Sequence, residues 1–412
     1  MQNQIPNNWQ KVKLGEVAED VRDLYEPSKT ENLNYIGLEH IDQGTLRLNE
    51  IGKSSEIKSS KKIFKENDIL FGTLRSYFRK VVKPQFSGVC STDIAVIRAK
   101  ENNDQNFLFY FIANPYFVNF ASLPGEGTKM PRAKWSYLSK TEWTIPKLEE
   151  QKRISSILSS FDDKIEMNNK IAKTLEDMAS EIFKEWFVKF RFPGWEKTEF
   201  VDSELGKIPK GWEVIKLEKI LKLKHGYAFK GNKFINEKTN NIVVRMGNFQ
   251  ENNGLQFLNN TVYLKNIDSQ NKYLLNPGDI VMILSDITRE GRLIGNVGII
   301  PNDEKSYFLN QRVAKIETDK KYILYLLNLF TSKEFHQHCL SRADSATVLN
   351  LKNEHIHDYE IALPENNIFK KFDELIEPIM NKKEHIKYEN QKLAQMRDLL
   401  LPKLMKGEIR IQ

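Results

Sequence analysis

Two long stretches of the sequence carry apolar residues at alternating steps of four and three positions. The first runs from Ile154 to Trp186 and the second from Phe372 to Leu404. This spacing places one narrow apolar stripe on a helix, the pattern of helices that pack against a partner along a seam. A chain with one such helix near its middle and another at its end is expected to pair them with each other. The predicted seam residues are Ile154, Leu158, Phe161, Ile165, Leu175, Ile182, Phe372, Ile376, Ile379, Ile386, Leu393 and Leu400.

Polar residues also stand on the seam, at Asn168, Lys383, Asn390 and Arg397. A polar residue inside a helix seam fixes the register of the pair at some cost in stability. The same residues can instead face partner subunits that cover the flanks of the pair, and both interpretations can hold. Pro378 lies within the second seam, so we expect either a kink just before it or a late start of that helix.

The segments that precede the two helices resemble each other. A tryptophan and a short alternating strand open both, at Trp9–Leu14 and Trp212–Leu217, and each segment closes on a strand that ends in proline, Pro146 or Pro364. Because Trp9 and Trp212 are 212 − 9 = 203 positions apart, the repeat is a duplicated domain and not a solenoid, whose units are far shorter.

Within each segment, short strands alternate with turns rich in Gly, Asn, Asp and Pro, which is typical of an α+β domain. Asn67–Leu70 and Gly278–Val281 are corresponding strand entries, and the apolar runs Phe107–Ile112 and Tyr322–Leu327 are corresponding helices. We predict two globular domains, residues 1–148 and 192–364. Residues 149–191 are predicted to form the central helix and residues 365–412 the distal helix.

The order globule, helix, globule, helix lets the two helices pair only in antiparallel directions when the connections are short. The predicted fold class is therefore α+β, with two homologous α/β domains separated by a pair of long antiparallel coiled-coil helices in a pseudo-twofold, circular arrangement. A helix of about 35–40 residues is about 55 Å long. Such a pair would hold the two domains at a fixed separation.

Composition limits the class of protein. The chain has 412 residues, of which 40% are hydrophobic, and a formal net charge of +7, which predicts folded domains and favours a polyanionic partner. A mildly basic protein without such a partner fits the charge equally. No apolar run is long enough to span a bilayer, and residues 1–15 lack a signal-peptide core. Cys90 and Cys339 suggest neither a disulfide framework nor a four-ligand zinc site, so we expect a reducing, cytoplasmic setting.

Two similar basic domains in opposite orientations form a bivalent reader of double-stranded DNA, because a duplex is itself pseudo-twofold symmetric. Since the domains differ in sequence, they should read different half-sites. The alternative from topology and charge is a scaffold whose domains bind other proteins.

Several segments resemble the specificity subunits of type I restriction–modification enzymes. Phe183–Pro193 and Glu204–Trp212 are similar to the central conserved segment of that family, and Arg397–Ile409 is similar to its distal conserved segment. The match departs at Pro364–Asn367, which lacks the usual Glu-Gln pairing, so we expect an altered helix start there and an unaltered fold. Further similar segments are Leu148–Ile154, at the entry to the central helix, and Asp68–Arg75 and Gly226–Gly231, in the target-recognition domains.

The resemblance implies a non-catalytic subunit that reads a bipartite, asymmetric DNA site through two target-recognition domains. Two modification subunits, which carry S-adenosylmethionine and methylate an adenine in each half-site, would dock on it. Two restriction subunits, with ATP and Mg, would complete a translocating nuclease. No cofactor and no membrane partner are expected for this chain. A standalone DNA-modifying enzyme and a protein scaffold are the alternatives.

Motifs that would indicate catalysis or a metal are weak. Asn114-Pro-Tyr-Phe117 resembles the base-holding loop of amino methyltransferases, but the second proline is replaced by Tyr116 and no glycine-rich nucleotide loop precedes it. We interpret it as a turn that ends a helix. His336 and His338 would face apart on a helix, so ordinary surface residues are favoured over a metal site at His336–Cys339 and His355–His357.

Basic and aromatic clusters supply better candidates. Arginine suits guanine edges and phosphates, asparagine and glutamine suit adenine, and lysine contacts phosphates. For any single residue, a solvated surface side chain is the alternative. The candidate DNA contacts are Arg75, Tyr77, Arg79, Lys80, Thr128, Lys129 and Arg132 in the first domain and Lys224, Tyr227, Lys230, Arg245, Arg289, Arg292, Gln311, Arg312 and Arg342 in the second.

Overall fold

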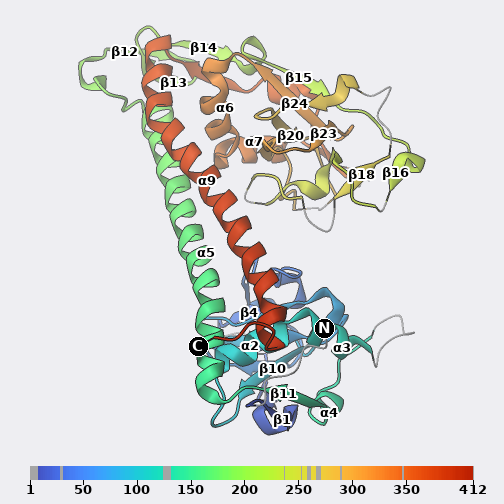
Figure 1. The fold of residues 1–412 in the computed structure, drawn as a ribbon. Coiled ribbons are helices and arrows are strands. Elements are labelled where there is room, and N and C mark those ends of the chain that lie inside the picture. The colour runs from blue at the N-terminus through green and yellow to red at the C-terminus, as the bar shows by residue number, and fades with distance from the viewer. Residues whose placement is uncertain are drawn as a thin grey trace. The chain divides into compact units, whose positions relative to one another are not determined.

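The computed structural model of the chain describes residues 8–27, 31–123, 131–235, 237–251, 253–257, 261–265, 271–287, 290–345 and 348–411. The chain divides into two compact units: unit 1 is Met1–Ile171 with His385–Gln412, and unit 2 is Ala172–Glu384. Each unit contains one globular part and one portion of each long helix (Figure 1). The domain boundaries predicted from the sequence stay a prediction, because this division cuts through both long helices.

The globular part of unit 1 contains two main sheets. The four-stranded antiparallel sheet has the order β2 (Ala18–Val21), β10 (Ile94–Ala99), β7 (Ile69–Gly72) and β8 (Val81–Val82). The five-stranded sheet has the order β3 (Leu24–Tyr25), β6 (Lys61–Phe64), β9 (Gly88–Cys90), β4 (Asn34–Ile36) and β5 (Gly52–Lys53). A separate antiparallel pair joins β1 (Gln10–Lys13) to β11 (Glu142–Ile145).

Helices complete the core of unit 1. They are α1 (Leu14–Val17), α2 (Gln105–Ala113), α3 (Pro115–Ser122) and α4 (Trp135–Leu138). Helix α2 is buried from Phe107 to Ala113. The Asn114 side chain accepts a hydrogen bond from the backbone N–H of Tyr116, which caps α3 where α2 ends. The interpretation of Asn114–Phe117 as a turn that ends a helix is therefore confirmed.

Unit 2 repeats this plan. Its four-stranded sheet has the order β15 (Leu221–His225), β24 (Val313–Thr318), β20 (Ile280–Ile283) and β22 (Val297–Ile299). Its five-stranded sheet has the order β16 (Phe234–Ile235), β18 (Val262–Leu264), β17 (Asn241–Val244), β23 (Ser306–Leu309) and β19 (Leu274–Leu275). A pair joins β14 (Glu213–Lys216) to β27 (Glu360–Leu363).

The remaining elements of unit 2 are shorter strands and helices. A hairpin joins β12 (Phe200–Ser203) to β13 (Gly206–Pro209), and a small sheet has the order β21 (Ser285–Asp286), β26 (Leu349–Asn350) and β25 (Asp344–Ser345). The helices are α6 (Ile323–Phe330), α7 (Lys333–Arg342) and α8 (Asn353–His357).

The two globular parts share strand order as well as element content. In the four-stranded sheets, β2, β10, β7 and β8 correspond to β15, β24, β20 and β22. In the five-stranded sheets, the parallel pair β4–β9 corresponds to β17–β23, and an antiparallel neighbour flanks each side. The edge strands β3 and β16 lie at opposite ends of their sheets and break the correspondence. The predicted duplication of an α/β domain is confirmed.

One turn shows the repeat at atomic detail. Asn67 and Gly278 both have a left-handed backbone, with φ of 67° and 85°, a conformation that favours asparagine and glycine. The next residue, Asp68 or Asp279, accepts a hydrogen bond at 2.8 Å from the backbone N–H three positions before it. The matched sequence runs therefore mark a structural turn before β7 and β20.

The first long helix, α5 (Leu148–Phe183), continues as a π-helical turn, Lys184–Val188. Glu149 and Glu150 lie in its first turn, where the positive end of the helix dipole stabilises their negative charge. Gln151, 2% exposed, ties this helix to α2, because its side chain accepts from the Asp104 backbone N–H and donates to the Pro146 carbonyl.

The second long helix, α9, runs from Asn366 to Met405. The late start considered for it is wrong, because the helix begins before Pro378 and passes through it. Pro378 and Glu374, whose carbonyl loses its intrahelical partner, both lie on the exposed side, so water can hydrate that carbonyl. Phe372, Ile376 and Ile379 keep the opposite side buried.

The two helices are antiparallel within each unit. In unit 1, Asp162 contacts Arg397 and Asn168 contacts Asn390, so numbers rise along α5 as they fall along α9. In unit 2, Phe183 contacts Phe372 and Phe187 contacts Phe369, which is the same antiparallel order. The predicted seam residues Ile154, Leu158, Ile165, Phe372, Ile376, Ile379 and Ile386 are buried, and Phe161, Leu175, Ile182, Leu393 and Leu400 are half-buried.

Two seam asparagines, Asn168 and Asn390, bind across the helix pair. Asn168, 2% exposed, donates from Nδ2 to Asn390 Oδ1 at 2.9 Å and to Glu389 at 2.8 Å, and Asn390 donates to Asn169 at 2.8 Å. Because a one-turn slip would leave these buried amides without partners, they fix the register of the pair.

Both cysteines are buried and have no disulfide partner. Burial raises the pKa of Cys90 and of Cys339 to about 12. Since the thiolate is the nucleophile, we expect neither cysteine to be alkylated by iodoacetamide in the native protein at about pH 8, and both to react once guanidinium has unfolded it. Mass spectrometry of the alkylated peptides measures this, and rapid native alkylation of either cysteine would contradict it.

Within the described residues, no helix is long and apolar enough to cross a membrane.

Candidate nucleic-acid interface

Several candidate residues of unit 1 meet where β7 ends. The backbone N–H of Thr73 donates to the Asp93 carbonyl at 2.8 Å, and the Thr73 carbonyl accepts from Ala133 at 2.9 Å. Leu74 forms an antiparallel bridge with Arg132. We call residues 73–75, 93 and 131–133 the unit 1 corner. It brings Arg75 and Arg132 together from segments far apart in sequence.

The segment after this corner has an unusual backbone. Arg75 and Arg79 are both left-handed, with φ of 51° and 50°, and they flank the 3₁₀ turn Ser76–Phe78. Residues other than glycine rarely adopt this conformation, and such strain tends to collect at functional sites. The turn exposes the Arg75 side chain and 48% of Tyr77.

Arg79 and Lys80 point inward, unlike Arg75 and Tyr77. Arg79 donates from Nε to the Ala113 carbonyl at 2.6 Å and pairs with Asp398 at 3.2 Å, while burial lowers the pKa of Arg79. Lys80 donates to the Leu38 carbonyl at 2.5 Å. These donors bind acceptors within the fold, and the prediction that Arg79 and Lys80 contact DNA stays a prediction.

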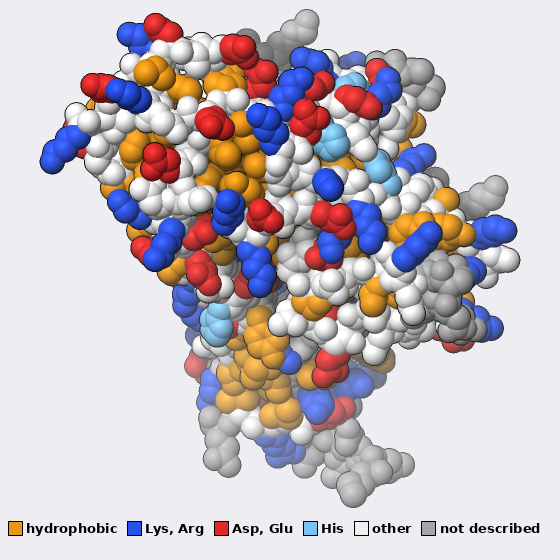
Figure 2. All heavy atoms as spheres, turned by 90° about the horizontal axis from the view of Figure 1, so that it is seen from above, with side chains coloured by type: hydrophobic (Ala, Val, Ile, Leu, Met, Phe, Trp, Pro, Cys, Tyr) orange, Lys and Arg blue, Asp and Glu red, His pale blue; other side chains and the backbone are white. Residues whose placement is uncertain are grey.

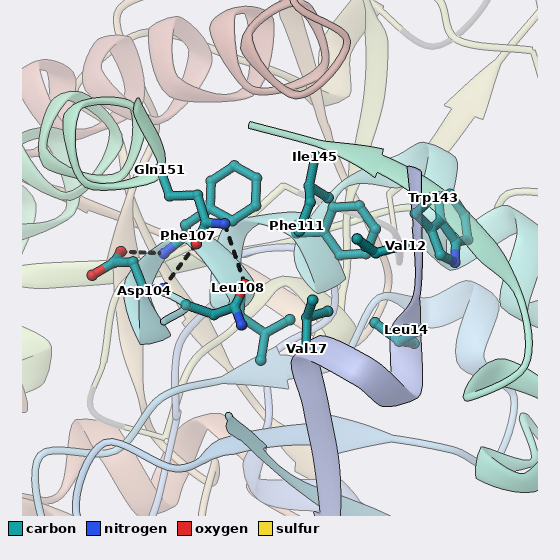
Figure 3. A pocket seen from close by; sticks show the side chains of 11 residues that line it. Val12, Leu14, Val17, Asp104, Phe107, Leu108, Phe111, Trp143, Ile145 and Gln151 are labelled. Atoms are coloured by element: carbon teal, nitrogen blue, oxygen red, sulfur yellow. Dashed lines mark hydrogen bonds between the residues drawn. The ribbon is translucent and has the colours of Figure 1, made fainter. Parts of the chain in front are cut away.

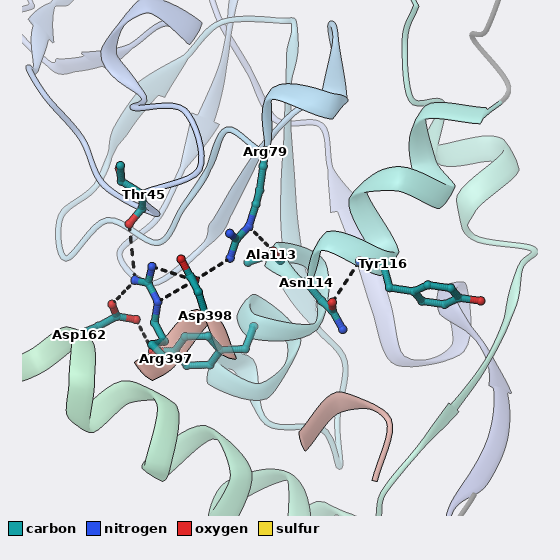
Figure 4. A network of polar contacts seen from close by, with 9 residues as sticks. Thr45, Arg79, Ala113, Asn114, Tyr116, Asp162, Arg397 and Asp398 are labelled. Carbon is teal, nitrogen blue, oxygen red and sulfur yellow. Dashed lines mark hydrogen bonds and ion pairs between the residues drawn. The ribbon is translucent and has the colours of Figure 1, made fainter. Parts of the chain in front are cut away.

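Arg79 belongs to a polar network around Arg397, which is 1% exposed (Figure 4). Arg397 pairs with Asp162 of α5 at 2.5 Å and with Asp398 at 3.1 Å, and it also donates to the Thr45 carbonyl. Burial by itself lowers the pKa of Arg397, but the two carboxylates outweigh it, so its pKa is raised. Tyr110 donates to Asp162 at 2.6 Å. The network joins both long helices to the globular part of unit 1.

Arg132 is exposed at the unit 1 corner and pairs with the Asp93 carboxylate. The ion pair fixes the position of the guanidinium and leaves its other N–H donors toward solvent. Thr128, Lys129 and Arg289 lie outside the described residues.

The unit 2 corner has the same hydrogen bonds. Leu284, the residue after β20, donates to the Arg312 carbonyl at 3.0 Å and accepts from Leu351 at 2.8 Å. Ser285 pairs with Asn350 in the antiparallel pair β21–β26, where unit 1 has the Leu74–Arg132 bridge. Residues 284–286, 312 and 349–351 therefore form the unit 2 corner, which presents Arg312 and Asn350 to solvent.

Tyr227 and Gln311 lie beside this corner. Tyr227 bridges Asn310, and its carbonyl accepts from the Gln311 backbone N–H at 3.1 Å. Gly226 permits this approach, because a Cβ atom there would lie 2.2 Å from the Asn310 carbonyl oxygen. The structure thus brings together Tyr227, Gln311 and Arg312.

The remaining candidates of unit 2 are not gathered at the corner by any of these contacts. Lys224 lies on β15, and Lys230 follows it in the chain; both are exposed. Arg245 is half-buried and precedes the short turn Met246–Asn248. Arg292 pairs with Glu251 at 3.4 Å, and Arg342 is exposed at the end of α7.

His336 and His338 lie on α7 and His355 and His357 lie on α8, and His338 Nε2 is 2.7 Å from the His355 carbonyl oxygen. Among the described residues, no group of three or more His, Cys, Asp or Glu side chains could hold a metal ion.

A small apolar cavity lies beside the entry to α5. Val12, Phe107, Phe111 and Trp143 are among the residues that line its volume of about 10 Å³, and Gln151 lies at one side (Figure 3). A volume of this size holds at most about one water molecule. The cavity is a packing gap and no ligand site.

A larger cleft of about 870 Å³ runs along α5 in unit 1. Its lining includes Asp162, Asp163 and Glu166 of α5 together with Arg47 and Lys83. Burial, then Asp162 and Glu166, raises the pKa of Asp163, and burial lowers that of Lys83. None of the predicted DNA contacts lines this cleft, and its carboxylates disfavour a polyanion there.

On the face that Figure 2 draws, surface charge by itself marks no interface. On the face drawn in Figure 2, basic and acidic side chains are intermixed, without a broad patch of one sign. The local arrangement at the corners is therefore more informative than net charge.

Sequence reasoning missed Asp93, Ser285 and Asn350. They reach the corners only through contacts between distant segments, such as the Leu74–Arg132 bridge. The matched turns before β7 and β20 were a usable signal, because counting onward from them aligns Leu74 with Ser285.

Comparison with known proteins matches the chain to the family described as the type I restriction modification DNA specificity domain, over residues 6–177 and again over residues 209–395. The type I restriction enzyme MjaIX specificity subunit of Methanocaldococcus jannaschii is 28% identical over 433 residues, which cover 99% of this chain and 95% of the relative. The HindI specificity subunit of Haemophilus influenzae is 23% identical, with 98% and 100% covered.

A crystal structure of the S subunit of a type I restriction-modification system from M. genitalium is 16% identical to the chain, with a TM-score of 0.52 over 98% of this chain and 97% of that one. This likeness shows a shared fold. The two family matches fall on the two copies of the duplicated domain and together span most of the sequence. The chain therefore belongs to the family of type I restriction–modification DNA specificity proteins.

Proposed function

We propose that this chain is the non-catalytic DNA-recognition subunit of a type I restriction–modification complex, and that each unit reads one half of a bipartite, asymmetric site. The observation that carries the proposal is the pair of domains with one topology but different side chains at their corners. One topology allows the same mode of docking on each half-site. Different side chains require the two half-sites to differ.

Two modification subunits are the proposed partners on the long helices. Both helices expose large apolar side chains away from the seam, among them Met167, Met178, Met396 and Leu399. Exposed apolar side chains on helices that already have a packed seam fit a surface that another subunit covers. S-adenosylmethionine would be bound by these partners, and ATP and Mg by two restriction subunits.

The proposal predicts the pattern of methylation in a cell that carries this chain and its modification subunit. Sequencing that detects methylated adenine should find one motif with two short defined parts around an undefined spacer. Deleting the gene for this chain should remove that methylation. A contiguous motif would contradict reading by two separate units, and methyl transfer by the purified chain alone would favour a standalone enzyme.

A protein scaffold is distinguished by salt dependence. The complex of this chain with its modification subunit should lose affinity for the motif steeply as the salt concentration rises. The reason is that protein cations displace counterions from the DNA phosphates, and this release is less favourable at high salt. Affinity that does not change with salt, or that is equal for duplexes with and without the motif, would support the scaffold.

A further inference from the structure

The two corners can be superposed position by position from their hydrogen bonds. Thr73 and Leu284 each donate to the residue that precedes the neighbouring strand of the sheet, Asp93 before β10 in unit 1 and Arg312 before β24 in unit 2. The bridges then pair Arg132 with Asn350 as equivalent residues. This equivalence rests on backbone contacts and is independent of side-chain identity.

The side chains at these equivalent positions differ in charge. Position 93 carries a carboxylate where position 312 carries a guanidinium, and position 132 carries a guanidinium where position 350 carries a carboxamide. The two corners therefore share their backbone contacts and differ in the functional groups of their side chains. Such a pattern is expected where duplicated domains keep one docking geometry and read different ligands.

Arg132, Arg312 and Asn350 are exposed, and two of them, Arg132 and Asn350, are held in place by neighbouring groups. Arg132 is fixed by Asp93, and Asn350 accepts from the Ser285 hydroxyl at 2.7 Å and donates to the Val348 carbonyl at 3.0 Å. Arg312 is exposed beside Gln311. Held side chains lose less conformational freedom when they bind, which suits recognition.

The chemistry of these groups suits the edges of base pairs. A guanidinium forms two parallel hydrogen bonds with guanine O6 and N7, and a carboxamide does the same with adenine N6 and N7. The strained turn with exposed Arg75 and Tyr77 leads directly from the unit 1 corner, which is a second sign of a functional surface there.

We propose that the equivalent corner positions determine which base pairs each unit reads. In one half-site, Arg132 contacts guanine. In the other half-site, Arg312 contacts guanine and Asn350 contacts adenine. This rests on the proposed function. Asp93 is a positioning residue, since it holds the Arg132 guanidinium.

Arginine-to-lysine substitutions test the proposal with little risk to folding, because both arginines are exposed. The motif is first established with the natural chain. Arg132→Lys and Arg132→Ala should then each reduce discrimination at one G·C pair of one half-site by about 10- to 100-fold, and leave the other half-site unchanged. Arg312→Lys and Arg312→Ala should do the same in the opposite half-site. Lysine fails to rescue because an ammonium lacks the planar fork.

Matched controls are Arg98→Ala, which breaks an arginine–carboxylate pair toward the other end of β10, and Arg191→Ala, which removes an exposed paired arginine of unit 2. Both should leave every motif position unchanged. Binding of the complex with the modification subunit is measured against duplexes that each carry one altered base pair.

The outcomes separate the two proposals. Without a bipartite motif for the natural chain, the proposed function fails. With such a motif, a uniform loss across all duplexes that lysine restores would make the arginines phosphate contacts and overturn the inference. Unchanged discrimination in all four corner variants would overturn it as well.

Discussion

Replacing Arg397 by methionine is expected to lower the free energy of unfolding of unit 1 by about 2–3 kcal/mol. Methionine keeps much of the side-chain volume, but it leaves Asp162 without a guanidinium and leaves Asp398 with that of Arg79 alone. Removing one partner of a buried ion pair costs about 3–5 kcal/mol. The lower figure applies here because the Asp162 and Asp398 side chains are 25% and 40% exposed and keep part of their hydration.

Native-state hydrogen exchange measures this effect within one unit, which a global unfolding curve of a two-unit chain does not. The amides of α2 and of the last turns of α9 should show the loss. Lys164→Met is the matched control, since Lys164 pairs with Glu389 across the same two helices but is 50% exposed, and it should cost at most about 1 kcal/mol. Equal effects of the two substitutions would show that the Arg397 network adds no stability beyond that of a surface pair.

The long helices and the duplication could be predicted from the sequence because both depend on patterns within short segments of the chain. A 4-3 alternation of apolar residues needs no distant partner to be recognised, and the turns at Asn67 and Gly278 depend on the backbone freedom of those residues. The same local chemistry allowed Pro378 in α9, because Pro378 and Glu374, whose carbonyl loses its helical partner, lie on the exposed side of the helix.

Arg75 and Arg79 show where local reasoning ends. Both are arginines in one short basic segment, and both have a left-handed backbone. Their roles differ because Arg79 meets Ala113 and Asp398, which are 34 and 319 positions away in sequence. No property of the segment itself distinguishes an arginine that faces solvent from one that is bound by the fold.

The end of α5 departs from its periodic pattern for a physical reason. The 4-3 alternation places Trp186 on the seam and leaves Phe187 off it. The π-helical turn Lys184–Val188 widens the helix there, and both Trp186 and Phe187 are buried. The Phe187 ring centroid lies 4.8 Å from that of Phe372 and 4.8 Å from that of Tyr325.

Phe187→Ala is therefore expected to lower the free energy of unfolding of unit 2 by about 3–5 kcal/mol, because it opens a cavity among aromatic rings that cannot collapse around it. Phe187 is 7% exposed and also contacts Trp212 and Phe369. Val188 lies in the same turn but is 50% exposed, so Val188→Ala should change the free energy of unfolding of unit 2 by less than about 0.5 kcal/mol. Hydrogen exchange of α6 measures both. A loss below about 1 kcal/mol for Phe187→Ala would mean that the π-helical turn does not hold this ring inside the core, since an exposed phenylalanine costs little to remove.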